Sequence, residues 1–329
     1  MWTTCILAMA QAAAAAASSP SAPPVESIAP GVALLRGAML PERGPDGNTV
    51  IFDAPEGLVV VDTGRHAWHS DAILEHSRSR GRPIAAIVNT HWHLDHSSGN
   101  GRVKAAHAGI PVYATSAIDG VLSDGGFLAR NHESAKAMLD DPKLSATRKE
   151  EVRVFLATMA ESEVLRPDIV VQSGGERAIA GRSFDLRVTN GAVSEADLWL
   201  YDAGTGVAVI GDLVTLPAPF FETACPDRWR ESLDAVWAVP FRTAIPGHGE
   251  PMDRGEFDAW RGAFNRYVDC VASDSAARQC AATWADGVTQ FTGAGEAARK
   301  RVLDYAEYYV GMLRENGGKS ADCRDQSKL

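Results

Sequence analysis

The sequence lacks several features that would place it in common non-enzymatic classes. The chain of 329 residues contains no basic run of five or more residues and carries a net charge of −10, so a nucleic-acid partner is not indicated. Beyond the first residues, no apolar stretch approaches the ~20 residues that a membrane span requires. The five cysteines form no Cys-x-x-Cys pair, which argues against a zinc ribbon. The remaining composition, 45% hydrophobic and 22% charged, is ordinary for a globular enzyme.

The first 24 residues are expected to lie outside the folded domain. Residues 2–17 are apolar and rich in alanine, and a Ser- and Pro-rich segment follows them. This pattern is typical of the apolar region and cleavage site of a secretory signal peptide, although no Lys or Arg precedes it. We therefore expect a signal peptide or a disordered leader. A signal peptide would direct the protein to the periplasm or outside the cell, whereas without one the protein would be cytoplasmic.

Four cysteines lie beyond this leader, at Cys225, Cys270, Cys280 and Cys323. In an oxidising compartment Cys270 and Cys280 could close a short loop, which would leave Cys225 and Cys323 to pair. The alternative is four buried free thiols.

Short apolar runs alternate with turn residues from residue 30 to residue 255, which predicts strands separated by turns and helices. Residues 120–166 differ, because charged residues increase and Val152, Phe155 and Met159 recur at helical spacing. We expect a helical insertion there that could cover a site. Helical spacing also continues from residue 256 to residue 329. The predicted organisation is therefore a domain over 25–255, with this insertion, and a helical C-terminal extension over 256–329.

One short segment, 91–96, contains four side chains that can bind a metal: His91, His93, Asp95 and His96. It directly follows an apolar run, 84–90, that predicts a strand. Neutral imidazole and carboxylate are the ligands that zinc takes in open, catalytic sites. On a helix His91 and His93 would point apart, so we expect an extended segment or a tight loop. In such a loop these two lie on one side, while Asp95 and His96 turn toward a second position.

Polar side chains follow three other predicted strands. Asp62 begins an Asp-Thr-Gly turn, Asp212 ends a Gly-Asp pair, and His248 lies in Pro-Gly-His-Gly. Loops that follow strands commonly carry the functional groups of a fold.

With these four elements in this order, the chain resembles the metallo-β-lactamase superfamily over residues 28–253. The resemblance implies an α+β fold, an αββα sandwich in which two mixed β-sheets pack together and are flanked by helices. It also implies a metal-dependent hydrolase with a small-molecule substrate and zinc as the cofactor. The metal would lie at one edge of the sandwich.

The resemblance also implies a role for each matched residue. His91 and His93 correspond to two ligands of a first metal site, and Asp95 and His96 correspond to two ligands of a second. Asp212 corresponds to a carboxylate that bridges both metals. His248 corresponds to the last histidine of the second site. Asp95 would in addition act catalytically by orienting or deprotonating the attacking water. Asp62 corresponds to a buried carboxylate that steadies the ligand loop.

One position departs from the family pattern. The first metal site usually takes a third histidine from a segment that corresponds here to residues 190–198, and counting back from Asp197 places Val193 at that position. Valine cannot bind a metal. The second site keeps its complete ligand set, so we expect one or two zinc ions with the second site favoured.

Three interpretations of this departure remain open. A single metal could occupy the second site with help from His91 or His93. A nearby group could replace the missing ligand, the candidates being His66, His69, His132 and Glu195. Alternatively, the site could be impaired, leaving a protein that binds a metal or ligand without catalysis.

If a metal is bound, hydrolysis is favoured because zinc lowers the pKa of its water to about 7. The bond cleaved would be an ester, lactone, thioester or amide. We expect weak or no β-lactam hydrolysis, since the ligand set departs from the usual one and a fold does not determine a substrate.

Overall fold

The computed structural model describes residues 24–293 and 295–323, and the chain divides into two compact units after Val170. We call these the N-terminal unit and the C-terminal unit. The predicted signal peptide or disordered leader lies, up to residue 23, outside the described residues. Among the described residues, no helix is both long enough and apolar enough to cross a membrane.

The N-terminal unit contains a seven-stranded sheet whose strands follow one another in chain order. The first four strands pair antiparallel, and the fourth to the seventh pair parallel, so the sheet is mixed. The strands are β1 (Val25–Ala29), β2 (Val32–Leu35), β3 (Thr49–Ala54), β4 (Gly57–Val61), β5 (Ile84–Val88), β6 (Val112–Ala114) and β7 (Ile169–Val170).

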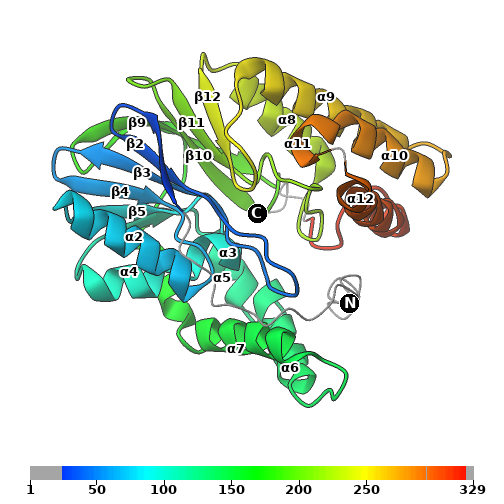
Figure 1. Ribbon diagram of the computed structural model, residues 1–329, viewed down its shortest axis with the longest axis horizontal. Helices are drawn as coiled ribbons and strands as arrows, with labels where there is room; N and C mark the ends of the chain where they lie inside the picture. The colour runs from blue at the N-terminus through cyan, green and yellow to red at the C-terminus, as the bar shows by residue number, and fades with distance from the viewer. Residues whose placement is uncertain (1–23, 294, 324–329) are drawn as a thin grey trace. The chain divides into compact units, whose positions relative to one another are not determined.

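Two helices, α2 (Ala67–Arg80) and α4 (Asn100–Ala106), cover one face of this sheet (Figure 1). Leu58 and Val60 lie two residues apart on β4 and therefore point to the same face. They pack in one apolar cluster with Ile73 of α2 and Val103 of α4. This layer holds the ends of β4 and β5, where Asp62 and the histidine-rich loop begin.

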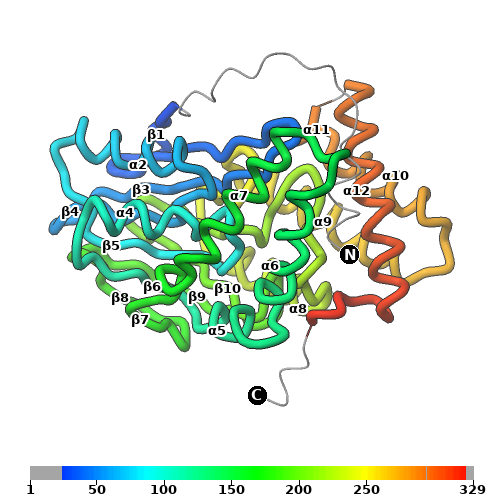
Figure 2. The backbone as a smooth tube through the Cα atoms, turned by 90° about the horizontal axis from the view of Figure 1, so that it is seen from below, coloured from blue at the N-terminus to red at the C-terminus, as the bar shows by residue number. Residues whose placement is uncertain are grey.

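The predicted insertion is helical. It consists of α5 (Ala117–Leu122), α6 (Phe127–Met138), α7 (Ala146–Ala160) and the 3-10 turn η1 (Ser162–Leu165). Helices α6 and α7 pack against each other (Figure 2). Their apolar cluster includes Trp92 and Leu94 of the histidine-rich loop, and the Trp92 ring lies 5.5 Å from the ring of Phe127. The insertion thus packs directly on the loop that carries the predicted ligands.

The C-terminal unit contains a five-stranded mixed sheet in the order β12-β11-β10-β9-β8. Only β11 and β12 pair parallel, and the other pairs are antiparallel. The strands are β8 (Gly175–Ile179), β9 (Arg182–Asn190), β10 (Ala196–Asp202), β11 (Val207–Gly211) and β12 (Thr243–Pro246).

Helices pack on this second sheet and on one another. The first, α8 (Pro226–Trp237), is followed by α9 (Arg254–Val271), which begins with a capping box between Asp253 and Glu256. The chain continues through α10 (Ala277–Gly287), α11 (Thr289–Thr292) and α12 (Glu296–Glu315). Residues from β10, β11, α8, α9, α10 and α12 share one apolar cluster. The fold class is therefore confirmed: two mixed sheets flanked by helices, with a helical insertion and a helical C-terminal region.

All four cysteines of the described chain are paired. Cys225 binds Cys323 across 98 residues, and Cys270 binds Cys280 across 10 residues. The structure therefore contains the two predicted disulfides rather than four free thiols. The longer bond fastens the segment after α12 to the start of α8.

Three strands escaped prediction from the sequence, namely β1, β7 and β8. Most side chains of β8 are exposed, and β7 has only two residues, neither of them buried, so both strands lack the apolar alternation that marks a half-buried strand. Their backbone pairing with a neighbouring strand defines them instead. The structure divides into units after Val170, which does not test the predicted domain boundary near residue 255. That boundary stays a prediction.

Candidate metal centre

The histidine-rich loop changes conformation in its middle. His91 and His93 precede a one-turn helix, α3 (Leu94–Ser97), for which His93 is the extended N-cap with φ −54° and ψ 140°. The expectation of a non-helical segment thus describes His91 and His93, but it is wrong for Asp95 and His96, which lie in the helical turn. The fold brings the imidazoles together: the ring centroid of His91 lies 4.4 Å from that of His93 and 4.3 Å from that of His96.

Asp62 is the hydrogen-bonding centre of this loop. It is buried and has a positive φ of 61°, a conformation that non-glycine residues rarely adopt. Its Oδ1 accepts from the backbone N–H of Thr90 at 2.8 Å. Its Oδ2 accepts from the Thr90 hydroxyl at 2.7 Å and from His96 Nδ1 at 2.8 Å. The unusual backbone conformation therefore belongs to a residue that three hydrogen bonds hold in place.

These bonds determine the tautomers of two histidines. The Thr90 hydroxyl donates to Asp62, so it accepts from His91 Nδ1, which lies 2.9 Å away. His96 Nδ1 donates directly to Asp62. Both imidazoles consequently carry their proton on Nδ1, which leaves the lone pair on Nε2. A neutral imidazole oriented by a carboxylate or hydroxyl is the usual form of a metal-binding histidine.

The segment before β3 contacts the histidine-rich loop through Gly47. The backbone N–H of Gly47 donates to the carbonyl of Asp95 at 2.8 Å. A Cβ at position 47 would lie only 2.3 Å from Cε1 of His96, so only glycine fits there. His96 Nε2 lies 3.7 Å from Oδ2 of Asp95. Asp95 and His96 thus form a buried pair bounded by backbone.

The C-terminal unit holds the other two predicted ligands. Asp212 directly follows β11 and His248 follows β12, and because these strands are parallel neighbours their ends meet at the same edge of the sheet. His248 Nε2 lies 3.5 Å from Oδ1 of Asp212. Gly247 allows this approach, since a Cβ there would lie 1.9 Å from Oδ1 of Asp212.

Val193 lies in the turn between β9 and β10, and its side chain is 1% exposed within the apolar cluster of the C-terminal unit. Its backbone is fixed on both sides, because its N–H donates to Asp197 Oδ2 at 2.9 Å and its carbonyl accepts from Thr223. Burial raises the pKa of Asp197 to about 7, although the hydrogen bonds from Ser194 and Val193 act in the opposite direction. At the position where the family pattern has a histidine, the turn therefore presents a buried apolar side chain.

Two of the proposed substitutes for that histidine are engaged elsewhere in the N-terminal unit. His66 uses both ring nitrogens: Nδ1 lies 2.9 Å from Asp46 and Nε2 lies 3.0 Å from Glu151. His69 Nε2 lies 2.8 Å from the hydroxyl of Thr49. His66 is therefore unsuited to replace the missing ligand.

The remaining two substitutes lie in other elements. His132 lies in α6 with Nδ1 3.5 Å from Glu133, and Glu195 ends the turn that contains Val193. No pattern in the sequence singled out Asp46 or Glu151, because the partners of His66 are 20 and 85 residues away.

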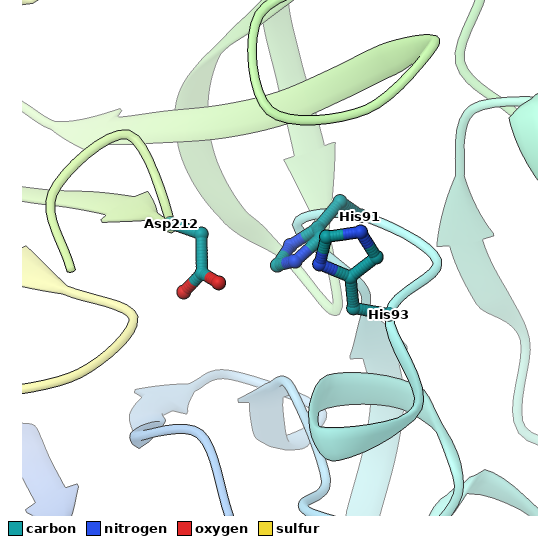
Figure 3. A group of neighbouring side chains, drawn as sticks. All are labelled: His91, His93 and Asp212. Carbon is teal, nitrogen blue, oxygen red and sulfur yellow. The ribbon is translucent and has the colours of Figure 1, made fainter. Parts of the chain in front are cut away.

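The donor atoms in each unit are of the kinds that zinc takes. Figure 3 shows His91 and His93 on the loop after β5 and Asp212 just beyond β11; the imidazoles offer ring nitrogens and the carboxylate an oxygen as ligand atoms. Asp95 and His96 add a carboxylate and an imidazole in the N-terminal unit, and His248 adds an imidazole in the C-terminal unit. Imidazole and carboxylate ligands without thiolate are typical of catalytic rather than structural zinc sites. The assignment of these residues as ligands stays a prediction.

The fold and these two groups of residues define an α+β protein that presents histidines and carboxylates at strand ends. The family model of the metallo-beta-lactamase superfamily matches residues 43–248, which is more than half of the chain. The chain belongs to this superfamily.

Curated relatives add a second comparison. The chain is 27% identical over 225 residues to a linear primary-alkylsulfatase from Pseudomonas sp. (strain ATCC 19151), a match that covers 63% of this chain and 42% of the relative. It is 25% identical over 228 residues to an (R)-specific secondary-alkylsulfatase from Pseudomonas sp., covering 64% of this chain and 34% of the relative. The chain thus spans less than half the length of these relatives.

Solved structures agree on the fold. A metallo-beta-lactamase from Pontibacter korlensis matches with a TM-score of 0.53 and 18% identity, covering 74% of this chain and 98% of that one. The DIM-1 metallo-beta-lactamase matches with a TM-score of 0.53 and 16% identity, covering 75% of this chain and 98% of that one. At such identities the likeness concerns the fold alone.

Proposed function

We propose that this protein is a zinc-dependent hydrolase that cleaves an ester bond. The observation that carries the proposal is the network around Asp62, which orients the Nε2 lone pairs of His91 and His96 within one buried loop. Membership of the superfamily adds Asp212 and His248 to the proposed ligand set. When bound, the metal would supply Lewis acidity and a water activated near neutral pH.

The side chains of this chain would hold the ligands in place and move the proton of the attacking water. Thr90 and Asp62 would hold His91 and His96 in the tautomer that leaves Nε2 as the ligand atom. Asp95, a buried carboxylate, would orient the attacking water and accept its proton. A general base must lie within hydrogen-bond reach of the proton that it accepts, and Asp95 lies beside the proposed ligand His96, with Oδ2 3.7 Å from Nε2.

The substrate class can be narrowed. Ester, lactone, thioester and amide carbonyls follow from the sequence, and the names of the two Pseudomonas relatives add sulfate esters of alcohols. We propose an ester as the substrate, with an alkyl sulfate as the first compound to test. Hydrolysis of a carboxylic ester and hydrolysis of a sulfate ester both place developing negative charge on an oxygen, and a metal can stabilise that charge.

A second candidate function follows from Val193. Its buried, apolar position leaves the first metal site with two histidines of its own. A catalytic zinc usually has three protein ligands, so this site would depend on Asp212, which is predicted to be shared with the second site. The alternative is therefore a protein that keeps the fold and binds a metal or ligand with little or no catalysis.

One experiment separates these candidates. The purified full chain is analysed for bound metal and then assayed with a primary alkyl sulfate, a secondary alkyl sulfate and p-nitrophenyl acetate, with and without EDTA. Release of sulfate or nitrophenol that EDTA abolishes and added Zn²⁺ restores supports the hydrolase. Stoichiometric zinc without turnover of any compound would favour the binding protein. A folded chain that takes up no zinc would contradict the proposed site.

We also propose that the protein is exported. Two disulfides join the four cysteines of the described chain, and such bonds form and persist in oxidising compartments. The apolar leader predicted from the sequence supports the same destination. Fractionation of cells that produce the full chain, with mass determination of the mature N-terminus, tests this proposal.

A further inference from the structure

A buried histidine lies between two carboxylates in the N-terminal unit. Asp46 Oδ2 lies 2.9 Å from His66 Nδ1, and Glu151 Oε2 lies 3.0 Å from His66 Nε2. His66 and Asp46 are almost fully buried, and the Glu151 side chain is 12% exposed. A carboxylate can only accept a hydrogen bond, so both ring nitrogens must donate. His66 is therefore an imidazolium in this arrangement.

The three residues come from three separate segments. Asp46 lies in the loop between β2 and β3, His66 is the N-cap of α2, and Glu151 lies in α7 of the insertion. Glu151 also accepts from the guanidinium of Arg43 and from the backbone N–H of Gly44, each at 2.9 Å. Helix α7 is thus fastened to the β2–β3 loop by hydrogen bonds that converge on one carboxylate.

The same loop bounds the proposed metal ligands. Asp46 Oδ1 accepts from the backbone N–H groups of Arg65 and His66 at 2.7 and 2.9 Å, which fixes the position of residue 46. The next residue, Gly47, donates to the carbonyl of Asp95 and leaves no space between its Cα and the ring of His96. A displacement of Asp46 would therefore move Gly47, the next residue, and with it the backbone that contacts Asp95 and His96.

We propose that His66 is a positioning residue, whose imidazolium joins Asp46 to Glu151 and so couples the helical insertion to the loop that bounds Asp95 and His96. The coupling to the ligands rests on the proposed function, whereas the Asp46–His66–Glu151 bridge does not. The insertion also packs on Trp92 of the ligand loop, so it contacts both this loop and the β2–β3 loop. Loosening of α7 would free both contacts.

The charges around His66 agree with this role. Burial alone would lower the pKa of His66, but hydrogen bonds and charges from Asp46 and Glu151 outweigh burial and raise its pKa above the usual 6.5. The pKa values of Asp46 and Glu151 are lowered: burial would raise each of them, and His66 reverses that effect. Three further groups lie close to the bridge. Arg43 bonds to Glu151, and the guanidinium of Arg65 lies beside Gly44. A charge on His69 would act on both His66 and Asp46.

The proposal predicts how the bridge depends on pH. Because the pKa of folded His66 is raised, the stabilisation from its charge is complete below the unfolded value near 6.5 and is lost as the pH rises through the folded value. The lost proton would leave one ring nitrogen with a lone pair facing a carboxylate. Acidic pH removes the bridge in a second way, when the pH falls through the lowered pKa values of Asp46 and Glu151.

The test compares Glu151→Gln with Glu150→Gln in the full chain. The two glutamates are adjacent in α7, but Glu150 is exposed and pairs with Arg153 of its own helix at 3.7 Å. Hydrogen exchange is measured on peptides from α7 and from residues 36–48 between pH 6 and 9, corrected for the intrinsic pH dependence. A charged hydrogen bond contributes enough that its loss should reduce protection about tenfold. Relative to wild type at pH 6, we expect this loss at all pH values for E151Q, whereas E150Q should follow wild type.

Wild-type protein should show the same loss only above the pKa of His66, and His66→Gln should remove that pH dependence. Nitrogen NMR of the histidine rings, with His66 assigned by comparison with H66Q, should show both ring nitrogens protonated at pH 6.5. Equal protection in wild type, E150Q and E151Q at pH 6.5, or a neutral His66 at that pH, would overturn the bridge.

The coupling is tested separately with Zn²⁺ alone. E151Q should bind Zn²⁺ about three- to tenfold more weakly than wild type and E150Q, as expected when a group that orients ligands is disturbed. Reduced protection with unchanged Zn²⁺ affinity would overturn the coupling. If wild type binds no Zn²⁺, the proposed function fails, and hydrogen exchange and NMR still decide whether the bridge exists.

Discussion

His96 Nδ1 donates a hydrogen bond of 2.8 Å to Oδ2 of Asp62, a residue that lies 34 positions earlier in the chain. The same oxygen accepts from Thr90, which in turn accepts from His91. One carboxylate oxygen therefore determines the tautomer of two imidazoles. The predicted role of Asp62 was to steady the ligand loop, and this geometry supplies the contacts that such a role requires.

Replacement of Asp62 should weaken metal binding. In Asp62→Ala the rings of His91 and His96 lose their orienting network, and the buried N–H of Thr90 loses its acceptor. Loss of such a partner typically reduces metal affinity about 10- to 100-fold. Zn²⁺ affinity measured by chelator competition checks this expectation. Asp53→Ala, which removes a carboxylate bonded to exposed Arg80, is the control and should bind as wild type. Equal affinities in both variants would mean that Asp62 does not orient the ligands.

Gly47→Ala should displace His96. The added methyl group would lie 2.3 Å from Cε1 of the ring, well inside van der Waals contact, so the ring or the β2–β3 loop has to move. We expect at least a tenfold loss of Zn²⁺ affinity, from the sensitivity of metal sites to the orientation of their ligands. Gly120→Ala in α5 is the matched control, because a Cβ there meets no atom within 4 Å. A G47A variant that binds Zn²⁺ like wild type would show that the loop yields without moving His96.

Val193→His tests the alignment of the missing ligand. If residue 193 corresponds to the third histidine of the first metal site, the variant should bind more zinc per chain than wild type. The substitution also puts a polar ring into an apolar cluster, which should lower the free energy of unfolding by about 1–3 kcal/mol. Val193→Ala controls for the lost side chain. Zinc content of all three proteins is measured after dialysis, and an unchanged content in V193H would mean that the ligand was misplaced.

Because the chain belongs to the metallo-beta-lactamase superfamily, it should also be assayed with a β-lactam. We expect wild type to turn over nitrocefin weakly or not at all, because Val193 removes one ligand of the usual set. Turnover at the rate of ordinary β-lactamases would refute this expectation.

His69 should make the protein sensitive to acid. Burial lowers the pKa of His69 to about 4, so the folded state disfavours its protonated form. Stability should therefore fall as the pH drops from 6.5 toward 4, since the unfolded chain binds the proton more readily there. The difference between these values corresponds to roughly 3 kcal/mol.

Urea unfolding at several pH values checks this. His69→Gln can still donate a hydrogen bond to Thr49 but cannot titrate, so its stability should depend less on pH in this range. His107→Gln, at the end of α4, serves as the control and should keep the pH dependence of wild type. Parallel pH profiles for wild type and H69Q would contradict the assignment.

Local patterns in the sequence were sufficient for most of the fold. The buried strands β4, β5 and β11 are continuous apolar runs, and α9 and α12 repeat apolar residues at helical spacing. These signals reside within a few neighbouring residues, so no tertiary contact is needed to recognise them. The exposed strand β8 has no such signal, because its strand character comes from pairing with β9.

The sequence by itself determined the family and the residues that could bind a metal, because His91 to His96 are close neighbours and their chemistry is independent of context. Only the tertiary structure decided which nitrogen of each ring carries the proton, since Asp62 and Thr90 reach these rings by folding. It also decided that His66 serves Asp46 and Glu151 rather than a metal. Hydrogen bonds between residues 20 to 85 positions apart depend on how strands and helices pack, and no local pattern encodes them.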